Sequence, residues 1–259
     1  MSPTFKPVTI DDSPHLLEKS HRLRYQAYCV EKQFLAAEDY PDQLECDAFD
    51  RDSVHVGVLD ADDEHIGTAR IVKPNSAGLP FRHHCTLFPL ETTFAQPGNT
   101  VVEISRVCID RRYTRRRADV FSDVPDPIPL DDHAIPSHDR RRERDDVFVT
   151  LVKALYHATK RMGATHWIVA IEKSLRRRIA RYGLPFQLAG PDVEYYGCVA
   201  PYIMSMAELD RVIHGRQFAS LDSFPIGLER IVFRGASPIE PDPRQFMQLR
   251  HSLKTGNSE

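Results

Sequence analysis

Apolar residues recur at two different spacings in the first part of the chain, and the change of spacing marks the predicted elements. Between residues 14 and 34 they recur at helical spacing, behind Ser13 as a capping residue and Pro14 in the first helical turn. Short apolar runs at 54–60 and 65–73 flank an acidic tight turn, which is typical of a β-hairpin. The pattern therefore predicts a helix followed by two antiparallel strands.

Apolar strands and amphipathic helices alternate in the second part. A buried strand is predicted at 101–109, and an apolar stripe at 147–163 that stops at a glycine indicates an amphipathic helix. A buried strand at 165–171, a short helix at 174–183 and an extended segment at 194–206 follow. This order predicts an α+β fold, in which helices cover a central mixed, mostly antiparallel sheet.

The same pattern predicts one domain over residues 1–235 and a polar C-terminal tail over 236–259. A last strand is expected at 226–233. Residues 111–146 carry four prolines, almost no apolar periodicity and basic runs at both ends, so we expect a long loop there.

Composition narrows the classes of function. The net charge of −3 argues against general binding to nucleic acid. No apolar run approaches the ~20 residues of a membrane span and no secretory signal is recognisable, so we expect a cytoplasmic protein that meets a membrane only through a lipid product. Five scattered cysteines do not suit a disulfide framework, and the isolated His83, His84 and Cys85 lack a second ligand cluster, so no metal is expected.

Six ionisable side chains interrupt or border otherwise apolar elements: Arg24, Asp47, Asp50, Arg70, Glu103 and Arg106. If they converge, they form a balanced buried network of three carboxylates and three guanidiniums; otherwise they are separate surface charges. Glu103 and Arg106 are three residues apart, so on a regular strand they point to opposite faces unless a bulge intervenes. A bulge there would itself indicate a site.

The motifs around these charges resemble a known group of enzymes. "RYQAYCVEKQF", "LECDAFDRDSVHV", "GTARIV" and "VVEISRVCID" resemble the acyl-homoserine-lactone synthases and long-chain N-acyl amino acid synthases. These are acyltransferases with a GNAT-type fold that usually take the acyl chain from acyl carrier protein. Within this group, "SLRRRIARYGLPFQLAGPDVEYYGCVAPYIMSM" is most similar to acyltransferases associated with PEP-CTERM and exosortase systems.

The resemblance implies a GNAT-like fold and a set of site residues. It matches Arg24, Tyr28, Phe34, Asp47, Asp50, Arg70, Glu103 and Arg106, and Phe34 stands where the signal synthases usually have a tryptophan. We expect Glu103 to accept the amine proton, directly or through a water, or only to pair with Arg106. Arg70 and Arg106 would bind the carboxylate of the acceptor or hold the acidic groups.

The remaining roles concern the acyl group. Backbone N–H groups near Val107, Cys108 and Ile109 would stabilise the oxyanion, whereas the Cys108 thiol is either packing or, less simply, a nucleophile. The acyl chain would lie among the apolar residues of 147–156 and 165–171, which otherwise are ordinary core.

The expected donor is acyl-phosphopantetheine on acyl carrier protein, with no permanently bound cofactor. The stretch "DRRYTRRRAD" lacks the glycine-containing pyrophosphate loop of ordinary GNAT enzymes, which argues against acyl-CoA. Basic residues would dock the acidic carrier protein: Arg111, Arg112, Arg115, Arg116 and Arg117. The expected acceptor is a small amine such as an amino acid; a lactone synthase that uses S-adenosylmethionine and a non-catalytic acyl-binding module stay open as alternatives.

Overall fold

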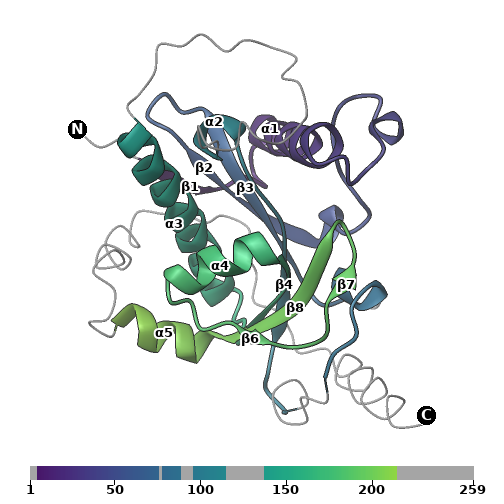
Figure 1. Ribbon diagram of the computed structural model, residues 1–259, viewed down its shortest axis with the longest axis vertical. Helices are drawn as coiled ribbons and strands as arrows, with labels where there is room; N and C mark the ends of the chain where they lie inside the picture. Colours follow the sequence, from purple (N-terminus) through teal and green to yellow (C-terminus); the bar gives the residue numbers. More distant parts are fainter. Residues whose placement is uncertain (1–4, 76–77, 89–95, 115–136, 215–259) are drawn as a thin grey trace.

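The computed structural model describes residues 5–75, 78–88, 96–114 and 137–214 (Figure 1). Their centre is a sheet with the order β1-β2-β3-β4-β5-β8-β6, with β7 paired to β8. The pairings are antiparallel except for the parallel pair β4–β5. The strands are β1 Lys6–Thr9, β2 Ser53–Leu59, β3 His65–Val72, β4 Val101–Ile109, β5 His166–Glu172, β6 Gln187–Leu188, β7 Val193–Glu194 and β8 Cys198–Ser205.

Helices and helical turns connect these strands. They are α1 Pro14–Tyr25, the π-helical η1 Gln26–Glu31, the 3₁₀ turns η2 Ala37–Asp39, η3 Asp50–Asp52 and η4 Pro80–His83, and α2 Arg111–Thr114, α3 Ser137–Arg161, α4 Lys173–Arg181 and α5 Met206–His214. The predicted cap is present, since the N–H of Leu16 donates to Ser13 Oγ at 3.4 Å. None of the helices in the described ranges is long and apolar enough to cross a membrane.

The alternation of side chains along β3 separates the two layers of helices. Ala69 lies in the main apolar core with Leu151 and Leu155 of α3. The neighbouring Thr68 points to the other face, where its hydroxyl lies 2.7 Å from that of Ser20 in α1. The sheet is therefore covered by α3 on one face and by α1 on the other, which confirms the predicted α+β arrangement.

The prediction of a loop over residues 111–146 was wrong at both ends. Residues 111–114 form α2, and α3 begins at Ser137, ten residues before the apolar stripe that indicated it. Starting a helix is energetically unfavourable, and the apolar stripe of α3, which packs on the sheet, stabilises this first step. Adding further turns costs less, and arginine and glutamate are good helix formers, so the helix extends toward Ser137. Residues 115–136, the expected strand at 226–233 and the tail at 236–259 lie outside the described residues.

The middle of the sheet opens at β4. Parallel pairing between β4 and β5 covers only Val101–Glu103 opposite His166–Ile168. On the other side of β4, Thr68 pairs with Cys108 but Arg70 pairs with Ser105, so β4 has one extra residue between these pairs. This is the expected bulge, and Arg106 within it has a left-handed φ of 52°. Strand β4 therefore both bends and separates from β5 directly after Glu103.

Candidate active site

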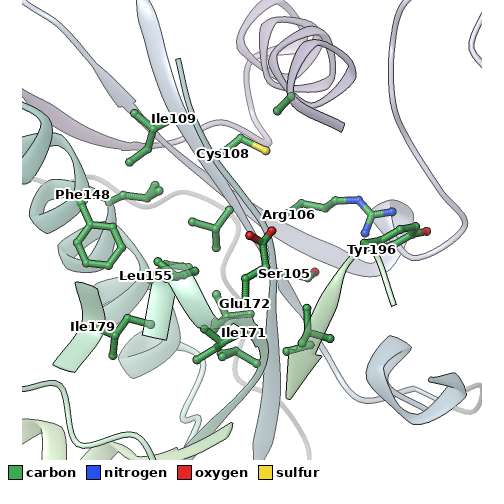
Figure 2. Close-up of a pocket in the computed structure, with 18 of the residues that line it drawn as sticks. Ser105, Arg106, Cys108, Ile109, Phe148, Leu155, Ile171, Glu172, Ile179 and Tyr196 are labelled. Atoms are coloured by element: carbon green, nitrogen blue, oxygen red, sulfur yellow. The ribbon is translucent and has the colours of Figure 1, made fainter. Parts of the chain in front are cut away.

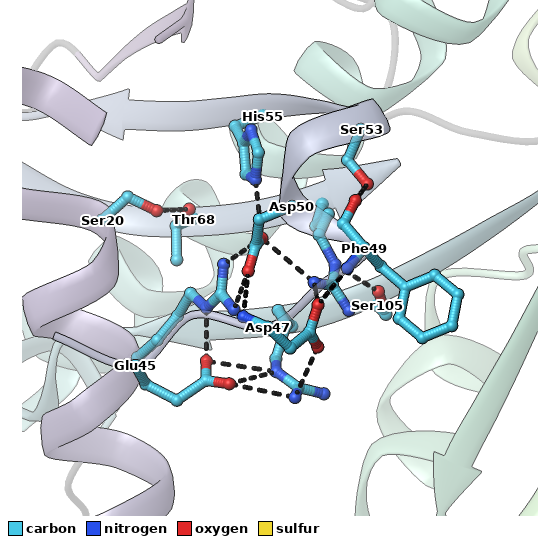
Figure 3. A network of polar contacts seen from close by, with 12 residues as sticks. Ser20, Glu45, Asp47, Phe49, Asp50, Ser53, His55, Thr68 and Ser105 are labelled. Carbon is cyan, nitrogen blue, oxygen red and sulfur yellow. Dashed lines mark hydrogen bonds and ion pairs between the residues drawn. The ribbon is translucent and has the colours of Figure 1, made fainter. Parts of the chain in front are cut away.

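Charged side chains from α1, β3, the β4 bulge and the segment before β2 converge in one network (Figure 3). Arg24 donates from Nε to Glu45 Oε2 at 2.5 Å and from Nη1 to Asp50 Oδ1 at 2.6 Å. Arg70 donates to Asp47 Oδ1 at 2.5 Å and to Ser105 Oγ at 3.1 Å. The arginines are almost fully buried, so the expectation of convergence is met for all of the six residues except Glu103, and the alternative of separate surface charges is wrong for these five.

The bulge delivers Arg106 to the same carboxylates. Its Nε donates to Glu45 at 3.1 Å and its Nη2 donates to Asp47 Oδ2 at 3.0 Å. Removing one partner from a buried pair of this kind typically costs about 3–5 kcal/mol, because it leaves an uncompensated charge. Arg106 is therefore held rigidly, with its guanidinium carbon 5.4 Å from the centroid of the Tyr28 ring and 5.5 Å from that of Tyr196.

Two members of the network are not among the six residues expected from the sequence. Glu45 is completely buried between Arg24 and Arg106 and takes the place that was expected for Glu103. His55 bridges Asp11 and Asp50, with nitrogen to oxygen distances of 2.7 and 2.9 Å. The sequence holds a signal for both, since His55 lies inside the apolar run 54–60 and Glu45 stands two residues before the predicted Asp47.

The pKa values in the network follow from this pairing. Burial alone would raise the pKa of Asp50, but the hydrogen bonds from His55 and Arg24 outweigh it and hold the pKa well below its usual value. The same competition between burial and neighbouring guanidiniums lowers the pKa values of Glu45 and Asp47. The three carboxylates are therefore ionised at neutral pH.

Glu103 behaves differently, although it lies near the network. Burial raises its pKa to about 7, against the opposing effects of a backbone hydrogen bond and of Arg70 and Arg106. Its Oε2 accepts a hydrogen bond from the N–H of Phe81 in η4 at 2.8 Å, whereas Arg106 makes its ion pairs with Glu45 and Asp47. Glu103 is thus a buried carboxyl group poised to exchange a proton near neutral pH.

A cavity of about 970 Å³ opens where β4 and β5 separate (Figure 2). Its apolar part is lined by residues of α3, β5, α4 and the segment after α4: Phe148, Leu151, Val152, Leu155, Trp167, Val169, Ile171, Ile179, Leu184 and Phe186. Its polar part includes Glu103, Ser105, Arg106, Lys32 and Glu172. The apolar segments expected to hold an acyl chain therefore line a cavity as well as contributing to the core.

The predicted site residues divide into two groups. One group lines the cavity: Tyr28, Phe34, Glu103, Arg106, Val107, Cys108 and Ile109. The other group, Arg24, Asp47, Asp50 and Arg70, belongs to the network and is not part of the cavity lining. Burial raises the pKa of the Cys108 thiol to about 11, which disfavours the thiolate that a nucleophile needs.

Two tyrosines that were not predicted as site residues, Tyr195 and Tyr196, also line the cavity. Tyr196 stacks on Phe34 with ring centroids 6.2 Å apart, and Tyr195 stacks on His84 at 3.7 Å. Tyr196 has a φ of 52°, a strained conformation for an aromatic residue, and Gly197 follows with a φ of 88°. The turn between β7 and β8 thus places Tyr196 against Phe34 and Tyr195 against His84.

The proposed docking residues are only partly covered by the structure. Arg112 is exposed and donates to Asp110 Oδ2 at 3.0 Å, and Arg111 precedes it in α2. Arg115, Arg116 and Arg117 lie outside the described residues. In α4, beside the cavity, Arg176 and Arg177 are exposed as well.

Two residues of the network, Asp50 and His55, lie with His21 in an arrangement that resembles a metal site. Among the described residues, His21, Asp50 and His55 bring one ligand atom each within 4.8 Å of the others. Asp50, however, already accepts from Arg24 and His55, and His55 is shared with Asp11. Two guanidiniums beside Asp50 also oppose a cation, so the cluster is explained by the network itself.

Comparisons with known proteins agree with this architecture. Residues 23–122 match the family model described as an acetyltransferase (GNAT) domain. The CoA-dependent acyl-homoserine lactone synthase BjaI, solved with SAM and isopentyl-CoA, is similar over 96% of this chain and 99% of its own, with a TM-score of 0.53 and 17% identity. The chain has a GNAT-like fold.

Two further solved structures show the same fold. TofI, solved in a ternary complex with an inhibitor and MTA, has a TM-score of 0.52 and 18% identity over 81% of this chain and 97% of its own. The acyl-homoserine lactone synthase LasI has a TM-score of 0.51 and 14% identity over 79% of this chain and 90% of its own. The comparison with curated proteins gave no match. The GNAT-like fold expected from the sequence motifs is thus confirmed.

Proposed function

We propose that this protein is an N-acyltransferase that moves a fatty acyl group from a phosphopantetheine thioester to the amine of an amino acid or a related small molecule. The observation that carries the proposal is the cavity at the separation of β4 and β5, which joins an apolar part to a buried carboxyl group with a pKa of about 7. The apolar part of the cavity suits the acyl chain, and the buried carboxyl group of Glu103 suits the amine that must lose a proton.

The reaction joins the amine nitrogen to the acyl carbon and breaks the bond from that carbon to sulfur. An α-amine is mostly protonated at neutral pH, so a group must accept its proton before or during attack. Glu103 accepts it, and the departing thiolate takes up a proton to leave as the phosphopantetheine thiol. A group that titrates near 7 is suited to this role because it is ionised in part and still basic enough.

Negative charge develops on the carbonyl oxygen during attack. Residues 107–109 lie along the part of β4 that no longer pairs with β5, and they line the cavity. Backbone N–H groups of this stretch stabilise the oxyanion. The buried network holds Arg106 and the bulge, and so keeps residues 107–109 in place. Arg24 and Arg70 belong to this network but do not line the cavity, so they act without contacting the substrates.

The donor we propose is acyl carrier protein, docked on the basic residues at and after α2, in the cytoplasm. Acyl-CoA is the competing donor, since the similar BjaI is described as CoA-dependent. A lactone synthase that uses S-adenosylmethionine is the second candidate function, because BjaI was solved with SAM.

The test supplies purified protein with acyl carrier protein and CoA thioesters of several chain lengths, and with a panel of amino acids, simple amines and S-adenosylmethionine. Mass spectrometry of the products identifies the donor, the acceptor and any lactone. Product from wild-type protein that is lost in Glu103→Gln, but kept in the surface control Glu64→Gln, supports the proposal. Tight binding of acyl thioesters without any product would instead support the non-catalytic acyl-binding module.

A further inference from the structure

We propose that the Lys32–Glu172 ion pair recognises the carboxylate and the ammonium of an α-amino acid group in the acceptor. This inference rests on the proposed function and names the acceptor-binding residues of the same cavity. Lys32 would take the carboxylate, and Glu172 would take the ammonium and direct it toward the separated strands.

The pair joins two segments of the cavity lining. Lys32 directly follows η1, whereas Glu172 is the last residue of β5, 140 positions later, and both line the cavity. Their side chains form an ion pair at the cavity lining. Figure 2 shows Glu172 beside Ile171, between the apolar residues of the cavity and Arg106. The pair therefore stands where an acyl chain and an acceptor would meet.

The buried arginines are unsuited to binding the acceptor. Arg106 is bound to Glu45 and Asp47, and Arg70 to Asp47 and Ser105. An acceptor carboxylate could recruit one of them only by displacing Glu45 or Asp47, each of which would then lose one of its two guanidinium partners, which is costly in a buried site. The sequence-based role of Arg70 and Arg106 in holding acidic groups is accordingly the one we keep.

Lys32 and Glu172 can exchange partners at small cost. Their side chains are 43% and 33% exposed, and ion pairs in contact with water contribute little net stability. A ligand that brings both a carboxylate and an ammonium replaces each lost contact with an equivalent one. A simple amine would leave the Lys32 ammonium without its new partner, and a simple acid would face the Glu172 carboxylate.

The surroundings of the pair suit the remainder of such a ligand. Lys32 Nζ lies 5.0 Å from the centroid of the Phe34 ring, which stacks on Tyr196. Aromatic faces attract a cation and offer apolar contact to a side chain. Free amino acids and S-adenosylmethionine both contain the α-amino acid group, so the two sources must be separated by experiment.

The experiment compares wild-type protein with Lys32→Met, Glu172→Gln, the exchanged pair Lys32→Glu with Glu172→Lys, and the control Lys19→Met. Lys19 forms a similar ion pair with Glu64, with side-chain exposures of 31% and 55%, but does not line the cavity. Each protein receives L-amino acids, S-adenosylmethionine and the decarboxylated amine of the best acceptor. The readouts are kcat/KM for each acceptor and ligand binding by saturation-transfer NMR.

We expect Lys32→Met to lower the ratio of kcat/KM for the amino acid over its decarboxylated amine by about tenfold or more, as for loss of a charge-assisted contact. Glu172→Gln should weaken binding of both acceptors, since both carry an ammonium. The exchanged pair restores the ion pair but exchanges the positions of the two charges. An amino acid would then bind with its carboxylate and ammonium in exchanged positions, so product should stay low. Lys19→Met should keep the wild-type ratio.

Three outcomes would overturn the inference: an unchanged ratio in Lys32→Met, full activity in the exchanged pair, or no binding of any amino acid or S-adenosylmethionine. These outcomes are distinct from failure of the proposed function. If wild-type protein binds amino acids in a Lys32-dependent manner but forms no product, the acyltransferase proposal fails and the recognition pair stands. If product forms and all variants keep the wild-type ratio of kcat/KM for the amino acid over its decarboxylated amine, the acyltransferase proposal stands and the recognition pair fails.

Discussion

Glu103 is the residue in which stability and catalysis conflict most directly. It is 4% exposed, and its pKa of about 7 lies above the ordinary value of 4.5 for a glutamate side chain. The folded protein therefore holds this proton more tightly than the unfolded chain. The resulting stabilisation is complete below about pH 4.5 and is lost as the pH rises through 7. Ionised Glu103, the form needed to accept a proton, is thus the form that the fold tolerates least.

Glu103→Gln should separate these two effects. We expect loss of product, together with a gain in the free energy of unfolding relative to wild type that grows between pH 5 and 8. One pKa unit corresponds to about 1.4 kcal/mol, so the relative gain can reach about 3 kcal/mol. Urea unfolding at each pH measures it. Product formation by wild type should rise with pH through about 7; a flat profile, or equal stability changes at both pH values, would contradict this role.

Glu45 provides the corresponding test of the network. It is completely buried and accepts from both Arg24 and Arg106. Glu45→Gln keeps the shape but leaves the two guanidiniums with one carboxylate charge fewer. We expect a loss of about 3–5 kcal/mol in the free energy of unfolding, measured in urea. Glu64→Gln, in an exposed pair with Lys19, should change it by no more than about 1 kcal/mol. A similarly small loss for Glu45→Gln would mean that the network relaxes around the missing charge.

Among the elements, the segment that contains η4 determines the surroundings of Glu103. The N–H of Phe81 donates to Glu103, and further along the segment the N–H of Phe88 donates to the carbonyl of Ala189 at 2.8 Å. Gly190 allows this close approach, because a Cβ at this position would lie 2.0 Å from the backbone oxygen of Thr86. A backbone atom cannot move aside as a side chain can.

Gly190→Ala should therefore displace the η4 segment. We expect a loss of about 1–3 kcal/mol in stability, as for other overpacked sites, and a reduced rate because Glu103 loses part of its cover. Thermal unfolding and the rate at saturating substrate measure the two effects. Gly67→Ala is the matched control, since its Cβ would meet no atom closer than 3.6 Å. If both variants behave alike, the packing of this segment does not matter to the site.

The elements also show what the sequence can predict. Strands β2, β3 and β4 were located to within about one residue, because each buries an apolar run bounded by clear turn signals. Strand β1 was missed since it has only four residues, one of them Pro7. The bulge could be inferred because regular alternation would have placed Glu103 and Arg106 on opposite faces. The burial of Glu45 between two arginines could not be inferred, because it depends on partners that only the tertiary structure brings together.

At the scale of the whole molecule, the sheet works as two halves joined at the first residues of β4 and β5. One half carries the network under α1, and the other carries β8 and the helices after β5. The halves separate directly after Glu103, so the buried acid lies at the apex of the opening. Apolar residues of α3 and β5 line its interior and so set how much of a chain it can hold.

The size of the opening can be tested at Val152, which lines the cavity from α3 and is 7% exposed. Val152→Phe should fill the space of about two or three methylenes, each worth about 0.8 kcal/mol when buried. We therefore expect kcat/KM for a long acyl thioester to fall by roughly 15- to 60-fold relative to that for a short one.

Val152→Ala is the counterpart, because it enlarges the cavity at the same position. It should shift the preference toward longer chains, although both variants are expected to lose some stability. A general loss of stability cannot produce opposite shifts in chain-length preference, so the pair of variants separates a chain-binding cavity from ordinary core. Equal loss of activity for all chain lengths in both variants would place the acyl chain elsewhere and leave the cavity without its proposed occupant.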